Sequence, residues 1–242
     1  MSDQQHIVAS FDRDLETIQA QIMKMGGMVE RAIADAARSL ESRDEELAEA
    51  VRGRDKAIDA LEQEVSEEAA RIIATRAPTA RDLRLVLTVI KISASLERIG
   101  DYAKNMAKRT TVLSSMSPVN GSSSALRRMA RAVEEMLKDV LDAYIQRDAD
   151  LAHEVINRDQ DVDQMYNAIF REFLTFMMED PRNITPCMHL HFIAKNTERM
   201  GDLVTSIAEQ VIYLVSGEMP GDPRPKGDTT SVDPGIAPDI NV

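Results

Sequence analysis

The chain has 242 residues, enough for one large domain or for two domains of about a hundred residues each. Its formal net charge of −12 argues against nucleic acid as a partner, because the phosphate backbone attracts basic surfaces. Only 4% of the residues are aromatic and Trp is absent, a composition that favours helices packed by aliphatic side chains over β-sheets.

Cysteine content and the N-terminal residues indicate a reducing compartment. The single Cys187 excludes an intrachain disulfide and a cysteine zinc site. Residues 1–6 lack the basic start and apolar run of a secretory signal, so none is expected. No uninterrupted apolar stretch of about 18 residues occurs, and we expect no membrane-spanning segment. We therefore predict a cytoplasmic location.

A first helix is predicted by apolar residues that recur every three or four positions from about Ala9 to Leu40. Gly26 and Gly27 interrupt this stripe, which indicates either a close helix contact or a kink. The Ser-x-x-Glu pattern that begins at Ser42 is typical of a capping box, and it predicts a tight turn into a second helix.

The second helix has its apolar stripe over residues 47–72 and ends before Pro78, where Thr79 begins the third helix. The third helix carries two apolar ridges, of which the one over residues 85–106 is an ordinary core stripe. The other ridge lies on the opposite side of the helix and continues into carboxylates. We therefore expect another part of the protein to cover this side as well. This second ridge comprises Leu83, Leu87, Ile90 and Ala94.

The linker between the two halves is predicted at residues 110–124, which are rich in Ser and Thr and contain Pro and Gly. Helical periodicity resumes over residues 126–144, and again over residues 151–176. The sequence therefore predicts a fourth and a fifth helix after the linker.

The last helix is predicted from turn signals at both of its ends. Asp180 and Pro181 end the fifth helix, and Thr185-Pro186 is typical of an N-cap followed by a first turn. The sixth helix is expected to stop near Gly217. The residues that follow are rich in Pro and poor in apolar side chains, so they are predicted to form a disordered tail.

A five-residue motif occurs twice, as Glu-Arg-Ile-Gly-Asp at 97–101 and as Glu-Arg-Met-Gly-Asp at 198–202. Arg43-Asp44 recurs in the same way as Arg147-Asp148. Spaced self-similarity of this kind indicates a duplicated unit. We therefore predict an all-α fold of two tandem three-helix bundles related by duplication. The predicted parts are a first bundle at 1–115, a second bundle at 116–217 and the disordered tail at 218–242.

Each copy carries two pairs of carboxylates at helical spacing. Residues four apart on a helix lie about one turn apart on the same face. Short connections make the second and third helices of each copy antiparallel neighbours, so four carboxylates could line one patch per copy. The first patch would comprise Asp55, Asp59, Glu97 and Asp101, and the second Asp159, Asp163, Glu198 and Asp202.

Such a patch repels itself unless it is protonated, paired with basic side chains or neutralised by cations. Oxygen-only ligands suit hard cations such as Mg²⁺, Ca²⁺ and Mn²⁺, and iron and zinc are further candidates. Arg98 and Arg199 follow the motif's glutamates and could instead pair with the acids in an ion-pair network or a solvated face. Gly100 and Gly201 weaken a helix where they stand, which indicates a close helix approach.

Enzymatic activity has no support in the sequence. A di-iron carboxylate oxidase would need Glu-x-x-His on two helices of a bundle, and that pattern does not occur. His189 and His191 bracket Leu190 and point to different faces, so they make a poor chelating pair. A nucleophile elbow, a P-loop and a glycine-rich dinucleotide motif are absent as well.

Two stretches of the first half carry a family resemblance. Residues 76–84 read Arg-Ala-Pro-Thr-Ala-Arg-Asp-Leu-Arg, and residues 96–105 read Leu-Glu-Arg-Ile-Gly-Asp-Tyr-Ala-Lys-Asn. Together they resemble the PhoU family of phosphate-uptake regulators, and residues 192–202 resemble that family's second half. The resemblance covers roughly residues 11–217 and leaves the C-terminal tail outside.

The resemblance implies a cytoplasmic, often dimeric protein that negatively regulates phosphate uptake and phosphate-starvation signalling. It implies contacts with the ATPase of a phosphate ABC transporter and with a sensor histidine kinase. Carried over by position, the eight carboxylates of the two patches would bind metal clusters, iron among them. The family often has His directly after the motif's Asp, whereas this chain has Tyr102 and Leu203, and Ser206 stands at the position that matches Asn105.

Our leading hypothesis is thus a non-enzymatic adaptor between transporter and kinase. A carboxylate-bridged metalloenzyme is one alternative, which the lack of histidine ligands disfavours. A membrane-surface helical bundle is the other, which the lack of a basic amphipathic helix disfavours.

Overall fold

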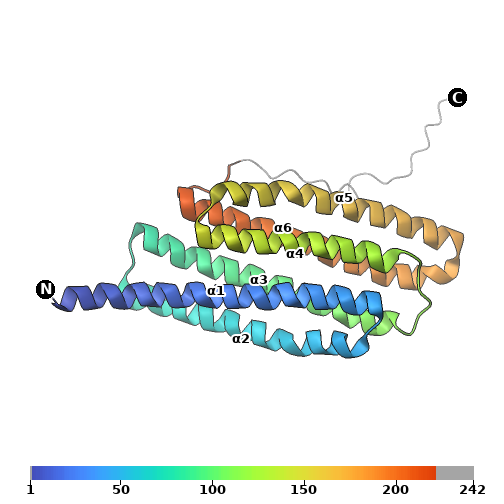
Figure 1. The fold of residues 1–242 in the computed structure, drawn as a ribbon, viewed down its shortest axis with the longest axis horizontal. Helices are drawn as coiled ribbons and strands as arrows, with labels where there is room; N and C mark the ends of the chain where they lie inside the picture. Colours follow the sequence, from blue (N-terminus) through green and yellow to red (C-terminus); the bar gives the residue numbers. More distant parts are fainter. Residues whose placement is uncertain (1, 222–242) are drawn as a thin grey trace, which may run out of the picture.

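The computed structural model describes the backbone of residues 2–221 and the side chains of residue 11 and residues 13–221. Six long α-helices make up this part, and it contains no strand. In chain order they are α1 (Ser2–Ser42), α2 (Glu45–Arg76), α3 (Ala80–Leu113), α4 (Ser122–Gln146), α5 (Ala149–Glu179) and α6 (Ile184–Ser216), with a short 3₁₀ turn, η1 (Pro181–Asn183), before α6. The prediction of an all-α fold is therefore confirmed (Figure 1). The predicted disordered tail lies outside the described residues except for residues 218–221.

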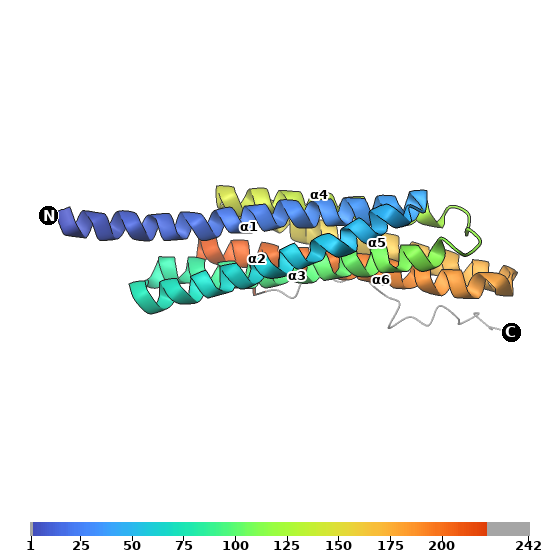
Figure 2. The same cartoon turned by 90° about the horizontal axis from the view of Figure 1, so that it is seen from below.

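The six helices form two three-helix bundles that share one core. Helices α1, α2 and α3 pack against one another, as do α4, α5 and α6. The bundles meet through α1 against α4 and α3 against α6, so α2 and α5 lie on the outside (Figures 1 and 2). Aliphatic side chains and methionines of the predicted stripes, such as Ile22, Met25, Leu96 and Met129, are fully buried in this core.

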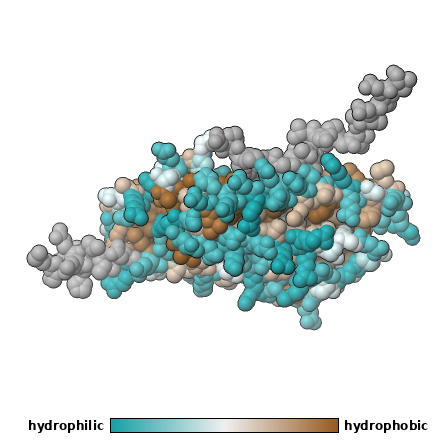
Figure 3. Space-filling view, turned by 45° about the horizontal axis from the view of Figure 1, so that its top comes forward, coloured by the Kyte–Doolittle hydropathy of each residue, from teal (hydrophilic) through white to brown (hydrophobic). Residues whose placement is uncertain are grey.

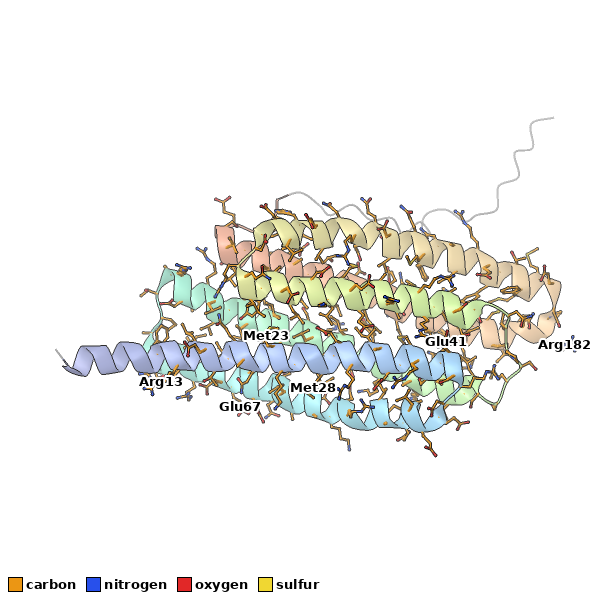
Figure 4. All side chains as sticks on the ribbon, viewed as in Figure 1. Arg13, Met23, Met28, Glu41, Glu67 and Arg182 are labelled. Atoms are coloured by element: carbon orange, nitrogen blue, oxygen red, sulfur yellow. The ribbon has the colours of Figure 1, made fainter. Side chains whose placement is uncertain are left out.

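The glycine pair in the first helix marks a close contact and no break. The helix α1 continues through Gly26 and Gly27. A Cβ added at Gly26 would lie 2.5 Å from Cδ1 of Leu141, a side chain of α4. The absence of a side chain at Gly26 therefore lets α1 and α4 approach closely where the two bundles meet. Further along the same junction, Glu41 near the end of α1 forms an ion pair with Arg127 of α4 (Figure 4).

The predicted capping box at Ser42 is wrong by two residues. Arg43 adopts a left-handed backbone conformation with φ of 56°, which ends α1. The N-cap of α2 is therefore Asp44, whose carboxylate accepts a hydrogen bond from the amide of Leu47. The second copy repeats this turn, because Arg147 has φ of 58° and Asp148 caps α5.

Two other boundaries differ from the prediction. The linker is shorter than 110–124, because α3 continues to Leu113, whose side chain is buried, and α4 begins at Ser122. The sixth helix starts at Ile184 with Asn183 as its N-cap, and not at Pro186 with Thr185 as the cap, because Asp180 caps η1 through the amide of Arg182 and η1 runs directly into α6. The stop near Gly217 is confirmed, since Gly217 ends α6 with φ of 88°.

The second apolar ridge of α3 is covered only in part, contrary to the expectation. Leu87 is 41% exposed and Ala94 is exposed, while Leu83 and Ile90 are half-buried. Ile90 packs against the buried core, while Leu87 and Ala94 lie on the exposed side of α3. Most of the face drawn in Figure 3 is hydrophilic, with apolar residues gathered in separate patches.

Candidate functional site: two acidic patches

The first predicted patch lies where α2 packs against α3. Asp55 on α2 is only 4% exposed and stands opposite Gly100 of α3, between the two carboxylates of the motif. Asp59 is one turn further along α2 and is exposed, while Glu97 and Asp101 are half-buried. The structure therefore brings the four carboxylates of the first copy into one electrostatic group.

The pKa shifts in the first patch reflect this proximity. Burial raises the pKa of Glu97, and the charges of Asp101 and Asp59 raise it further. Burial also raises the pKa of Asp59, with Asp55 as the next cause. Glu62 on the following turn of α2 raises the pKa of both groups and thus belongs to the patch, although the sequence motif did not include it.

Lysine, and not the motif's arginine, neutralises the first patch. The ammonium group of Lys104 donates hydrogen bonds to Oδ2 of Asp55 and Oδ1 of Asp101, and so bridges α2 and α3. These carboxylates raise the pKa of Lys104, although burial opposes them. Arg98 is exposed and forms no ion pair with any described residue. A lysine three residues after the motif's Asp is visible in the sequence, but its contact with Asp55 depends on the packing of two helices.

The second predicted patch lies at the matching place between α5 and α6 and is more deeply buried. Asp159, Asp163 and Glu198 are 2%, 3% and 5% exposed, while Asp202 is half-buried. A Cβ added at Gly201 would lie 2.7 Å from Oδ1 of Asp159, so the carboxylate rests directly on the α6 backbone. The predicted close approach at the motif's glycine is thus confirmed in both copies, and it is tighter in the second.

The neutralising cation of the second patch comes from the other side of the motif. Nζ of Lys195 lies 2.9 Å from Oε1 of Glu198, and it also lies 4.9 Å from the centre of the Tyr166 ring. Position 94, which corresponds to Lys195 in the first copy, is an alanine, and position 205, which corresponds to Lys104, is a threonine. Arg199, like Arg98, is exposed and forms no ion pair within the described part of the chain.

Supporting ion pairs repeat as well and hold the acid-bearing helices in place. Arg54 of α2 pairs with Asp35 of α1, with Nη1 2.8 Å from Oδ2. The corresponding Arg158 of α5 pairs with Asp139 of α4. The two copies therefore share the scaffold around their patches and differ in the lysine that enters each patch.

The donor atoms fit a hard cation by type, since every carboxylate supplies oxygen only. Oδ1 of Asp55 and Oε2 of Glu198 are buried and accept no hydrogen bond from the described residues, so each is available to a ligand. Asp55 also lines a cavity of about 130 Å³ between α1, α2 and α3, together with Met28 and Gly100. Within the described residues no three His, Cys, Asp or Glu side chains converge as they would around a metal ion. In the first patch the Lys104 ammonium already lies between Oδ2 of Asp55 and Oδ1 of Asp101.

No helix in the described part of the chain combines the length and the apolar character needed to cross a membrane. The fold and the positions of the carboxylates together define the class: a duplicated helical scaffold with a set of carboxylates on the matching helix pair of each copy. Comparisons with known proteins identify the family. Residues 22–110 and 126–211 each match the PhoU domain.

The chain is 45% identical over 227 residues to a phosphate-specific transport system accessory protein PhoU homolog of Caulobacter vibrioides, covering 94% of this chain and 99% of that one. It is 43% identical over 226 residues to the protein of the same name from Rhizobium meliloti, covering 93% of this chain and 95% of that one. The crystal structure of PhoU from Pseudomonas aeruginosa superposes with a TM-score of 0.82 at 40% identity, covering 86% of this chain and all of that one. The crystal structure of the phosphate transport system regulatory protein PhoU from Streptococcus pneumoniae superposes with a TM-score of 0.79 at 27% identity, covering 86% of this chain and 98% of that one.

The chain therefore belongs to the PhoU family.

Proposed function

We propose that this chain regulates phosphate uptake by binding partner proteins and that it catalyses no reaction. Relatives that are 43–45% identical over nearly the whole chain are named as accessory proteins of a phosphate-specific transport system, and this similarity carries the proposal. A rigid scaffold with paired acidic patches suits a binding role. The proposal requires the chain to work in the cytoplasm, where the transporter ATPase and the kinase have access to ATP.

The regulatory role is tested by phosphate uptake in a strain that lacks this chain. Uptake of radiolabelled phosphate in phosphate-rich medium should rise in the deletion strain and return to its original rate when the chain is supplied. A reporter for phosphate-starvation genes should be switched on in the same medium. Unchanged uptake and reporter activity in the deletion strain would rule out negative regulation.

The partners in this proposal are the ATPase of the phosphate ABC transporter and the sensor histidine kinase. Acidic patches favour a partner that presents a basic surface, because complementary charge steers association. Affinity capture of the full chain from cells at high and low phosphate should recover both proteins. If neither the ATPase nor the kinase is recovered, the adaptor hypothesis fails.

A matched pair of variants shows whether the patches make this contact. Glu97→Gln with Glu198→Gln removes one charge from each patch, while Glu64→Gln with Glu154→Gln removes two exposed charges elsewhere on α2 and α5. Capture should fall in the first double variant and stay unchanged in the second. Equal capture by both would place the partner surface away from the patches.

We also propose that the patches bind hard cations, with iron, Mg²⁺, Mn²⁺, Ca²⁺ and Zn²⁺ as the candidates. The buried oxygen atoms of Asp55 and Glu198 that accept no hydrogen bond support this proposal. Elemental analysis of purified chain should find less metal in the double variant with Glu97→Gln and Glu198→Gln than in the wild type. Equal metal content in both would exclude these ligands.

Homodimer formation is the last part of the proposal. The exposed ridge at Leu87 and Ala94 on α3 supports it, because uncovered apolar ridges often mark protein interfaces. Sedimentation velocity should give a dimer for the wild type and a monomer for Leu87→Glu. Ile145→Glu, a change at an exposed apolar residue at the end of α4, serves as the control and should leave the dimer intact.

A further inference from the structure

The stretch Arg76–Arg84 helped to identify the family, but it takes no part in the acidic patches. Two of its arginines have structural partners. Nε and Nη2 of Arg76 lie 3.1 and 2.9 Å from Oδ2 of Asp14, which ties the end of α2 to α1. Arg84 lies over the ring of Tyr213 at 5.5 Å and packs against Gly217 at the end of α6. Neither contact accounts for the third arginine of the stretch, Arg81.

Arg81 lines a cleft of about 330 Å³ where α3 begins and α4 ends. Figure 1 shows the start of α3 and the end of α4 on the same side of the molecule. Arg147 lines the same cleft, together with Leu15 of α1 and Leu85 of α3. Neither guanidinium forms an ion pair with a residue in the described part of the chain. Gln19 of α1 adds an amide to the same cleft.

Arg81 and Arg147 line the same cleft and carry like charges, which repel each other. Burial lowers the pKa of Arg147, Tyr144 raises it, and the charge of Arg81 lowers it again. Both guanidiniums remain protonated at neutral pH, since arginine does not lose its proton in proteins. Arg147 also sits at a left-handed backbone position, with φ of 58°, that glycine or asparagine usually takes. An anion bound between the arginines would relieve their repulsion and form charge-assisted hydrogen bonds with both.

The cleft is not simply basic, because Glu16 of α1 and Asp82 of α3 also line it. Neither carboxylate forms an ion pair with a described arginine or lysine. Positive and negative groups therefore face the same space without neutralising each other directly. A ligand that suits both arginines and both carboxylates must accept hydrogen bonds from the guanidinium groups and donate at least one hydrogen bond to a carboxylate.

Inorganic phosphate has this combination of groups. At neutral pH it carries negative oxygens together with at least one O–H, which a carboxylate can accept. Sulfate has no proton at this pH, so a neighbouring carboxylate repels it. A phosphate monoester loses its last proton with a pKa of about 6 and also lacks the O–H donor at neutral pH.

We propose that the cleft between the start of α3 and the end of α4 binds inorganic phosphate. Arg81 and Arg147 hold the negative oxygens, and Asp82 or Glu16 accepts the hydrogen bond of the protonated oxygen. This inference deepens the proposed function, because it makes the regulator a direct receptor for the ion whose uptake it controls. It is independent of the acidic patches and of the partner proteins.

Isothermal titration of the full chain with phosphate, with EDTA present to keep metal ions off the acidic patches, tests the proposal. The wild type should bind phosphate saturably at one site per chain. Arg81→Gln and Arg147→Gln should each weaken binding about tenfold or more, because each removes a charged donor. Arg98→Gln, a change at an exposed arginine of α3 outside the cleft, should bind like the wild type. Thermal melts followed by circular dichroism check that each variant is folded.

Selectivity provides the second part of the test. Sulfate and a phosphate monoester at the same ionic strength and neutral pH should bind at least about tenfold more weakly than phosphate. In Asp82→Asn with Glu16→Gln, the amides can donate to sulfate, so the preference for phosphate should shrink.

Three results would overturn the proposal: no saturable binding by the wild type, unchanged binding by both arginine variants, or equal affinity for sulfate and phosphate. The regulatory proposal fails separately, if uptake is unchanged in cells that lack the chain.

Discussion

The two acidic patches occupy equivalent places in the two bundles, yet they are neutralised differently. In the first, Lys104 bridges Asp55 and Asp101 at an edge that is partly open to solvent. In the second, Lys195 reaches Glu198 from the opposite side of the motif, and three of the four carboxylates are buried. Duplication thus preserved the positions of the carboxylates and of the glycine, while the cation partner was free to change. The first patch is therefore more accessible to solvent, and the carboxylates of the second patch are more closely packed.

The largest expected effect concerns the packing of the motif's glycine. In Gly201→Ala the new Cβ would lie 2.7 Å from a buried carboxylate oxygen of Asp159. We expect a loss of about 2 kcal/mol in unfolding free energy, since overpacking of a filled site costs this much. In Gly100→Ala the new Cβ would meet only the end of the Ile58 side chain, at 3.1 Å. The higher helix propensity of alanine stabilises this variant by about 1 kcal/mol, which offsets the cost of that contact.

Urea denaturation of both alanine variants gives the measurement. Gly100→Ala should be nearly neutral, so the two values should differ clearly. Equal losses at Gly100 and Gly201 would mean that the two helix pairs approach each other equally closely, contrary to the structure.

The lysine partners should come next in size. Lys104→Met leaves the buried carboxylate of Asp55 without its cation, and Lys195→Met does the same to Glu198. We expect each to lower the unfolding free energy by about 1.5 kcal/mol, because a buried acceptor loses its partner. Lys108→Met, a change at an exposed lysine of α3, is the control and should have little effect.

Divalent cations should then distinguish the two lysine variants. If a hard cation can replace the Lys104 ammonium, Mg²⁺ or Mn²⁺ should raise the melting temperature of Lys104→Met more than that of the wild type. Lys195→Met should gain less, because its patch is more enclosed. A gain in neither variant would contradict the proposal that these patches bind cations.

The helix caps offer a comparison in which the two copies should behave alike. Asp44 and Asp148 each accept a hydrogen bond from an amide of the following helix, at 2.9 and 3.0 Å. Asp44→Ala and Asp148→Ala should each cost about 1 kcal/mol, the usual value for an N-cap. Chemical denaturation provides the check, and a difference well above the error of the method would show that the duplicated turns are not energetically equivalent.

The helices could be predicted from the sequence because each carries an apolar stripe of helical period, and a bundle buries such stripes directly. The boundaries were less accurate for local reasons. Arg43 ends α1 in a left-handed conformation that the sequence does not indicate for an arginine, so the cap moved from Ser42 to Asp44. The exposed position of Leu87 depends on which side of α3 meets α1, α2 and α6, and the period of one helix does not contain that information.

That the eight carboxylates lie on pairs of neighbouring helices could be predicted, because the motif recurs at matching places in a duplicated chain. Their cation partners could not, since the contact of Lys104 with Asp55 joins residues 49 positions apart on different helices. Arg98 and Arg199 stand next to the acids in sequence, but one step along a helix turns a side chain by about 100°, which takes both arginines to the exposed side. Adjacency in sequence is therefore a poor guide to ion pairing on a helix.

The smallest expected effect is a pH dependence confined to the first patch. Folding raises the pKa of Asp59 and Glu97, first because each carboxyl loses part of its surrounding water and secondly because of neighbouring carboxylates. An acid with a raised pKa in the folded state holds its proton more tightly there than in the unfolded chain. Below about pH 3.5 both carboxyls are protonated in the folded and in the unfolded chain, so they do not lower the stability of the fold. Their destabilising effect is complete once the pH exceeds their raised pKa values.

Asp59→Asn with Glu97→Gln removes this cost, so the double variant should be more stable than the wild type at pH 7. The gain should be only about 0.5 kcal/mol, because Asp59 is exposed and solvent screens its charge. Unfolding curves of both proteins measured from pH 3 to pH 7 should converge as the pH falls. If the gain persists undiminished at pH 3, repulsion among ionised carboxylates is not its cause. The first patch would then not be a charged group that a cation can stabilise.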